Sequence, residues 1–156
     1  MPKTKCSDPA YVAGTIANNA TVCRQFARFL GGDVIASDDN SCTVMRARPE
    51  LSITILGRPY AAMAMFEYQS PDTGGITLNT GEVPMRQREV NPFIDSLRDD
   101  DILVTTIQTH WLFDRPRLVS VHFEAVRDPL AFAQAVAGAI TTLTAATGRA
   151  DDDDGD

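Results

Sequence analysis

The sequence predicts an α+β fold in which helices pack on a mostly antiparallel sheet, forming a two-layer sandwich. Three cap-plus-proline signals, Asp8-Pro9, Asn91-Pro92 and Asp128-Pro129, are typical of helix starts. Between them, several short stretches alternate apolar and polar residues, as strands do when one face is buried. The chain has 156 residues, 44% of them hydrophobic, which is enough for one domain to bury its own core.

The first part of the chain is predicted to be helical as far as residue 31. Asp8-Pro9 would cap this helix, and Cys23, Phe26 and Leu30 recur at helical spacing before Gly31-Gly32. A loop is expected over residues 33–41. The next three stretches, residues 42–48, 51–56 and 63–69, are predicted to form an antiparallel meander of strands.

The second part of the chain is predicted to contain two helices and three strands. A short strand is expected at residues 76–79, and a helix from Asn91-Pro92 to Asp99. Two further strands are expected at residues 102–108 and 118–126, before a last helix that ends near Gly148. With no internal repeat or linker, residues 1–150 are expected to form one domain, and the acidic residues 151–156 a disordered tail.

Composition argues against several classes of protein. The net charge of −7 belongs mostly to the acidic tail, and the arginines are scattered, so nucleic-acid binding is not expected. No stretch is long and apolar enough to span a membrane, and no membrane partner is expected. The odd set of Cys6, Cys23 and Cys42 lacks CxxC spacing, which predicts free thiols in a cytoplasmic protein and no thiolate zinc site.

Only two histidines exist, and both fall at or beside the last predicted strand pair. The apolar residues Val119, Val121, Phe123 and Ala125 would face the core, matched by Leu103, Thr105 and Ile107 on the other strand. The opposite face gathers polar residues without lysine or arginine. These are Thr106, Gln108, Ser120, His122 and Glu124. Such a face is either solvated or lines a cavity.

The separation of the two histidines limits what they can do together. In a simple hairpin around residues 111–115, His122 would pair near Val104, about 20 Å from His110 along the strand. The two imidazoles could then not share a metal ion. They would converge only if residues 110–113 fold back over the sheet, or if the two strands are not partners.

An ordered series of short motifs resembles the LppY/LpqO-like family, whose function is unknown. The downstream pieces are residues 89–94 (EVNPFI), 102–105 (ILVT), 110–113 (HWLF), 116–117 (PR), 122–124 (HFE) and 128–130 (DPL). The upstream pieces are residues 25–27 (QFA), 30–32 (LGG), 42–44 (CTV), 55–58 (ILGR) and 81–82 (GE). The resemblance covers residues 21–143, and its specificity comes from the order of the pieces.

This resemblance implies a His-Asn-His motif followed by a histidine in a strand. Here Gln108 and Thr109 replace the first two residues, whereas His110 and His122 are retained. If the family holds a metal there, this chain lacks one imidazole ligand. A site of two histidines and one carboxylate, Glu89 or Glu124, remains an alternative, and metal-free use becomes the more plausible one.

Our first hypothesis is a cytoplasmic pocket protein acting as an acid–base enzyme, such as an isomerase, cyclase or hydrolase, on a small organic molecule. The catalytic groups would be His110, His122 and Glu124, because histidine suits proton transfer at neutral pH. The ligand-binding groups would be Glu89, Thr106, Gln108, Trp111, Arg117 and Ser120. The sequence identifies no cofactor, and it is compatible with a monomer or a homodimer.

Two other hypotheses stay open: a non-catalytic ligand-binding or interaction module, and a metalloprotein. Several site residues also have structural readings. Glu89 could simply assist the start of a helix. Arg117 could make a structural hydrogen bond beside its proline turn, and Trp111 could be a hydrophobic plug instead of a lid or ligand platform.

Overall fold

The computed structural model describes residues 10–146, with side chains to residue 143. Its helices are α1 (Asn19–Leu30), α2 (Gln87–Asp99) and α3 (Pro129–Ala146). Its strands are β1 (Asp33–Ser37), β2 (Cys42–Ala47), β3 (Ile53–Ile55), β4 (Arg58–Tyr60), β5 (Met63–Gln69), β6 (Thr77–Met85), β7 (Leu103–Thr109), β8 (Asp114–Arg115) and β9 (Val119–Arg127). The predicted α+β class is confirmed.

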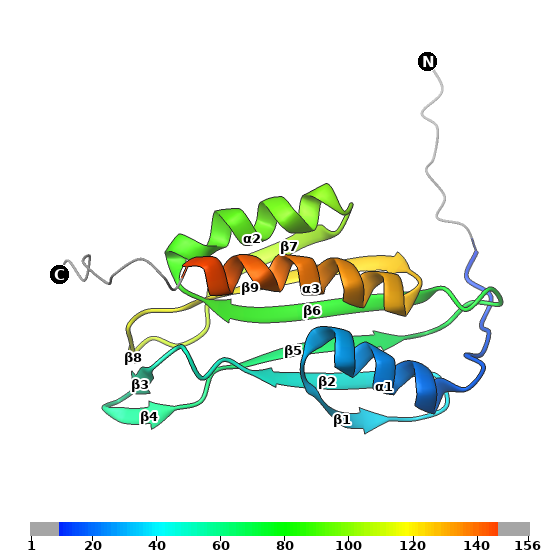
Figure 1. The fold of residues 1–156 in the computed structure, drawn as a ribbon, viewed down its shortest axis with the longest axis horizontal. Coiled ribbons are helices and arrows are strands. Elements are labelled where there is room, and N and C mark those ends of the chain that lie inside the picture. Colours follow the sequence, from blue (N-terminus) through cyan, green and yellow to red (C-terminus); the bar gives the residue numbers. More distant parts are fainter. Residues whose placement is uncertain (1–9, 147–156) are drawn as a thin grey trace, which may run out of the picture.

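The strands form two sheets in which hydrogen-bonded neighbours are antiparallel. The large sheet has six strands in the order β1-β2-β5-β6-β9-β7, and the small sheet has the order β4-β3-β8. The three helices cover one face of the large sheet (Figure 1). α1 lies against β1 and β2, α3 against β6 and β9, and α2 against α3 and β7. We call the covered side the helix face and the opposite side the open face.

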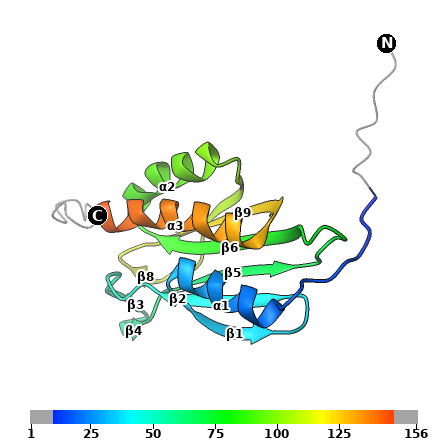
Figure 2. The same cartoon turned by 45° about the vertical axis from the view of Figure 1, so that its right-hand side comes forward.

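The core lies between the helices and the helix face. Buried aromatic side chains dominate it, and burial of each ring contributes about 1.5–3 kcal/mol. They are Phe26, Phe66, Tyr68, Phe93, Phe123 and Phe132. A second, smaller cluster contains Ile53 of the small sheet together with Leu51, Ala62 and Leu118. The small sheet lies at one end of the large one (Figure 2).

The predicted first helix is too long at its N-terminal end. α1 begins at Asn19, and residues 10–18 are not helical because they run against the turn after β5. There Gly14 N donates to Pro71 O over 2.8 Å. A Cβ on Gly14 would lie 1.9 Å from the Asp72 carbonyl oxygen, so only glycine permits this approach. Asp8-Pro9 and the acidic tail, residues 151–156, lie outside the described residues.

The predicted meander is also wrong. β2 pairs with β5 directly, whereas β3 leaves for the small sheet together with β4, which was not expected. The predicted loop at 33–41 contains the edge strand β1. The predicted four-residue strand at 76–79 is the nine-residue strand β6 at the centre of the large sheet. Gly81 and Pro84 obscured β6 because both residues usually weaken a strand.

α2 begins five residues earlier than its cap-plus-proline signal predicted, so that Pro92 lies in its second turn. The Glu89 carboxylate accepts from the backbone N–H of Arg86 at 2.8 Å and so caps the start of the helix. α3 begins as predicted, with Asp128 Oδ1 accepting from the N–H groups of Leu130 and Ala131.

The free-thiol prediction is wrong for two of the three cysteines. Cys23 on α1 and Cys42 on β2 form a disulfide. Both are buried, because the apolar stripe that predicted α1 places Cys23 against the helix face of β2. Their Cα atoms are 5.5 Å apart, a usual separation for a disulfide.

No helix within residues 10–146 combines the length and the hydropathy needed to cross a membrane.

Candidate functional site

Three cross-strand rows on the open face hold most of the predicted site residues. In the middle row, Met65, Glu82, His122 and Thr106 are neighbours on β5, β6, β9 and β7. The next row toward the small sheet contains Pro84, Ser120 and Gln108. The row on the other side contains Glu67, Thr80, Glu124 and Leu103.

Glu82 is the centre of a polar cluster on this face. Its Oε1 accepts from Ser120 Oγ over 3.0 Å. The same oxygen lies 3.7 Å from His122 Nε2 and 3.8 Å from His110 Nδ1. The side chains of Glu82, His122 and His110 are 23%, 30% and 49% exposed, so the cluster is open to solvent. We call Glu82, His110, Ser120 and His122 the Glu82 cluster.

The two histidines converge, contrary to the 20 Å separation of a simple hairpin. His110 follows the last residue of β7, and the residues after it leave the strand, as the alternative reading required. Ser120 is small and fully buried, and it lies in the row next to that of His122, on the side toward the end of β7. The Glu82 carboxylate therefore contacts Ser120 and lies within 3.8 Å of a ring nitrogen of each histidine.

An irregularity in β7 explains a second difference from the prediction. The pairing with β9 shifts between Val104 and Thr106, so that His122 is opposite Thr106 and not Val104. The predicted core positions Val121, Phe123 and Ala125 are confirmed. Leu103, however, is opposite Glu124 and is 65% exposed. A β-bulge inserts one residue and so exchanges the faces of a strand on either side of it.

The hydrogen bonding of His122 depends on its tautomer. Nε2 lies 3.5 Å from Gln108 Nε2, which is a donor only, and 3.7 Å from the acceptor Oε1 of Glu82. With Nε2 unprotonated, the imidazole accepts from Gln108. With Nε2 protonated, the N–H group can point toward Glu82, and Gln108 then has to turn its amide oxygen, not its NH2 group, toward the imidazole. In either tautomer, Nε2 of His122 thus has one polar neighbour suited to it, Gln108 or Glu82.

Aromatic side chains border the cluster on the side of His110. The ring centroids of His110 and Trp111 are 5.0 Å apart, and those of Trp111 and Tyr60 on β4 are 5.5 Å apart at an interplanar angle of 68°. Trp111 is 38% exposed, so it is not the buried plug considered from the sequence. The exposed Arg117 donates to the Leu112 carbonyl oxygen over 3.5 Å, a contact to the backbone of the same loop.

The two predicted carboxylates are not part of the Glu82 cluster. Glu124 lies on the same face as His122 but two residues further along β9, in register with Thr80. Glu89 is 1% exposed, and both its oxygens bind Arg48, at 2.9 and 3.1 Å. The geometry therefore supports the structural alternative for Glu89, which is to assist the start of α2.

Glu82 itself was missed as a site residue. It lies within residues 77–85, most of which was not predicted to be a strand, and no local motif marks it. The one available signal was the Gly81-Glu82 pair among the pieces of the family resemblance.

The Glu82 cluster is not a ready metal site. Within residues 10–146, no three His, Cys, Asp or Glu side chains form a group that could hold a metal ion. The imidazole nitrogens approach Oε1 itself, which Ser120 also binds, and do not surround a common empty centre.

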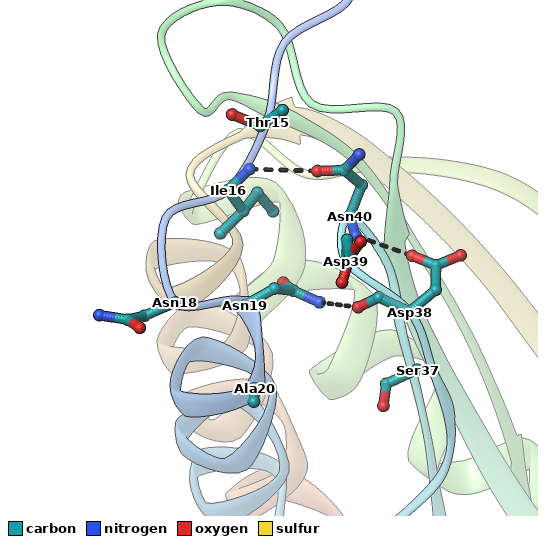
Figure 3. A pocket seen from close by; sticks show the side chains of 9 residues that line it. All are labelled: Thr15, Ile16, Asn18, Asn19, Ala20, Ser37, Asp38, Asp39 and Asn40. Atoms are coloured by element: carbon teal, nitrogen blue, oxygen red, sulfur yellow. Dashed lines mark hydrogen bonds between the residues drawn. The ribbon is translucent and has the colours of Figure 1, made fainter.

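A hollow of about 540 Å³ lies away from the cluster, between the start of α1 and the β1–β2 turn (Figure 3). Asn19 donates to the Asp38 carbonyl oxygen there, and the backbone N–H of Asn40 binds the Asp38 carboxylate and lowers its pKa. No predicted site residue lines this hollow.

Comparison with known proteins adds a family but no activity. The profile described as Domain of Unknown Function (DUF1259) matches residues 24–142. Neither a curated protein nor a solved structure shows significant similarity to the chain. Since the match covers most of the sequence, the chain belongs to the family defined by the Domain of Unknown Function (DUF1259).

Proposed function

We propose that the chain binds a small organic molecule at the Glu82 cluster and that His110 and His122 transfer protons to or from it. One observation carries this proposal: a single carboxylate oxygen of Glu82 lies within 3.8 Å of both imidazoles and accepts from Ser120. Carboxylate–histidine contacts orient an imidazole and stabilise its protonated form, as general acid–base catalysis requires.

Each residue has a distinct role in this proposal. Glu82, and not Glu124, is the carboxylate that orients the histidines. His122 is the proton-accepting group when its Nε2 faces the Gln108 amide, and the more exposed His110 is the group that returns a proton. Thr106 and Gln108 supply neutral hydrogen bonds to the ligand. Isomerisation, cyclisation and hydrolysis all use such proton transfers.

Metal binding is the second candidate, because the same two distances bring two imidazoles and a carboxylate together. A divalent ion would have to displace the Ser120 hydroxyl from Oε1 and draw the imidazoles around itself. A binding module without turnover is the third candidate, and it would use the same residues.

The test is a ligand-observed NMR screen of small polar organic molecules against metal-stripped protein, with Glu82→Gln as the test variant. Glu67→Gln is the matched control, because Glu67 lies on the same face and also accepts from a hydroxyl, that of Thr43. We expect hits that bind the parent chain and Glu67→Gln but lose at least about tenfold in affinity with Glu82→Gln. Binding unaffected by Glu82→Gln would refute the site.

Hits from this screen separate the three candidates. If the hits are converted, and His122→Ala stops conversion while affinity changes less, the acid–base proposal holds. Hits that bind without conversion indicate the binding module. Stoichiometric zinc, iron or copper in the protein before stripping, with ligand binding restored only by that metal, indicates the metal site.

We further propose that the chain is an LppY/LpqO-like member of its family. The residues quoted above support this, in particular His110, His122 and the residues 89–94, which occur in the expected order. A profile built from LppY/LpqO-like sequences alone should match the chain better than profiles of other branches.

For the compartment, the Cys23–Cys42 disulfide argues against the cytoplasm that the sequence led us to expect, because disulfides persist mainly in oxidising surroundings. We propose an oxidising compartment. Cell fractionation would test this, and recovery of the chain only with the cytoplasmic fraction would contradict it.

A further inference from the structure

We infer that the ligand of the Glu82 cluster is an organic cation, an amine or a quaternary ammonium, that carries an apolar group. This inference rests on the proposed function and adds the chemical class of the ligand. Two observations support it: the sign of the charge on the open face, and an exposed aromatic corner beside His110.

The charged side chains of the large sheet are divided between its two faces. Register places four acids on the open face, Asp33, Glu67, Glu82 and Glu124. The only two basic residues in the six strands, Arg46 and Arg127, pair with helix-face residues. Within residues 10–146 the strands therefore give the open face acids but no lysine or arginine. A face of one sign attracts ligands of the opposite charge.

Trp111 and Tyr60 form two walls of a corner. Their rings meet nearly edge to face, and 38% and 39% of these residues remain exposed. The faces of such rings carry partial negative charge and bind ammonium groups by cation–π interactions, best of all in the case of tryptophan. Nothing in residues 10–146 covers this corner completely, so a ligand can reach both rings.

His110 joins the corner to the carboxylate. Its ring lies 5.0 Å from that of Trp111, and its Nδ1 lies 3.8 Å from Glu82 Oε1. One small molecule can thus contact the aromatic corner and the Glu82 carboxylate at once. Leu112 and Phe113, 75% and 64% exposed, continue the apolar surface beyond Trp111 for the remainder of the ligand.

Two arginines provide the strongest argument for an anionic ligand instead. Arg58 is on the same strand as Tyr60, and Arg117 contacts the backbone of Leu112. Arg58 belongs to β4 of the small sheet and Arg117 to the loop between β8 and β9, so neither comes from a strand of the large sheet, and among the described residues no ion pair joins either of them to Glu82. The test therefore includes an anion of the same shape.

The experiment uses Trp111, the only tryptophan of the chain, as the reporter. Its fluorescence is titrated with phenethylammonium, 2-phenylethanol and 3-phenylpropionate, which share a phenylalkyl group and differ in charge. We expect saturable binding of phenethylammonium at least about tenfold tighter than that of the alcohol or the anion. Glu82→Gln should abolish this preference, and Glu67→Gln should preserve it.

Each other outcome overturns the inference. Tighter binding of phenylpropionate, lost in Arg117→Gln, would assign the site to anions. Equal binding of the three probes, or none of them at millimolar concentration, would exclude selection for cations. If the NMR screen still finds neutral or anionic ligands that depend on Glu82, the proposed function stands and only this inference fails. If no ligand depends on Glu82, both fail.

Discussion

At the scale of single residues, one buried carboxylate holds three parts of the chain together. Glu89 binds the Arg48 guanidinium with both oxygens, and Arg48 also donates to the Pro84 carbonyl oxygen and to Glu50. Burial acts to lower the pKa of Arg48, but its bonds to Glu89 and Glu50 outweigh this effect and raise the pKa. The end of β2, the end of β6 and the start of α2 are fixed by this group.

Glu89→Gln should therefore destabilise the protein strongly, by about 3–5 kcal/mol, because the buried Arg48 would lose its buried ionic partner and keep only the partly exposed Glu50. The matched control is Glu50→Gln. Glu50 binds the same arginine, but its side chain is 35% exposed, so its loss should cost less than about 1 kcal/mol. Urea unfolding of both variants measures the difference. Equal costs would show that Arg48 does not depend on Glu89.

Tyr68 supplies a prediction for alkaline pH. Burial raises the pKa of Tyr68 to about 12, and its phenol donates a hydrogen bond to Asn19 Oδ1 over 2.6 Å. The unfolded chain has the ordinary tyrosine pKa of about 10. A raised folded pKa means that the stabilisation is complete below pH 10 and is lost as pH rises through about 12.

The variant for this prediction is Tyr68→Phe. It should lack the tyrosinate absorbance step near pH 12, and its stability should fall less steeply above pH 10. At neutral pH we expect it to be about 1–2 kcal/mol less stable, because the buried Asn19 amide loses a donor. A parent chain whose stability is flat between pH 10 and 12 would contradict the assignment.

Which residues form the Glu82 cluster could be predicted only in part. His110, Ser120 and His122 were identified because β9 alternates clearly and the only two histidines lie on it or just after β7. Glu82 was not, because it comes from a strand about 40 residues earlier whose register with β9 is set by packing across the sheet. Because the pairing of strands brings these residues together, no fixed spacing along the sequence marks the cluster.

At the scale of elements, the close contact between β6 and β9 depends on a glycine. Gly81 is opposite both Phe66 on β5 and Phe123 on β9. A Cβ there would lie 2.3 Å from the Phe123 ring. The missing side chain makes room for the ring at the centre of the core.

Gly81→Ala should cost about 1–3 kcal/mol, because Phe123 has to move within a close-packed core. Gly138→Ala is the control. Nothing lies within 4 Å of the Cβ position of Gly138 in α3, so alanine there should stabilise the helix by up to about 1 kcal/mol. Thermal unfolding compares the two directly. A neutral Gly81→Ala would mean that the ring is not confined as described.

The elements that the sequence predicted well are those with local signals. α3 has a cap, a proline and a long apolar stripe, and β9 has strict alternation. The elements that were missed depend on partners distant in sequence. Every residue of β1 is exposed, so that its burial does not alternate; β4 has three residues, and the irregularity of β7 is visible only against β9.

At the scale of the whole molecule, a covalent bond ties the helical layer to the sheet. The Cys23–Cys42 disulfide joins α1 to β2 across 19 residues of chain. It limits the freedom of the unfolded chain, and a loop of this size corresponds to about 3 kcal/mol.

Reduction should therefore lower the unfolding temperature by several degrees, and Cys23→Ala/Cys42→Ala should do the same without reductant. Of the three cysteines, one should react with a thiol reagent in denatured, unreduced protein, and all three after reduction. Cys6→Ser is the control, which should leave stability unchanged. Three reactive thiols before reduction would show that the bond does not form.

The contacts of Glu89 also have a consequence for how the protein folds. The carboxylate that caps the first turn of α2 is the one that must find Arg48, which is 41 residues away. Burying it before Arg48 arrives would leave a charge without compensation. The docking of α2 therefore requires β2 and β6 to be in place already. The capping of α2, which is local, and the ion pair with Arg48, which is long-range, thus form in a single cooperative step. In native-state hydrogen exchange, the amides at the start of α2 would open together with those of β2.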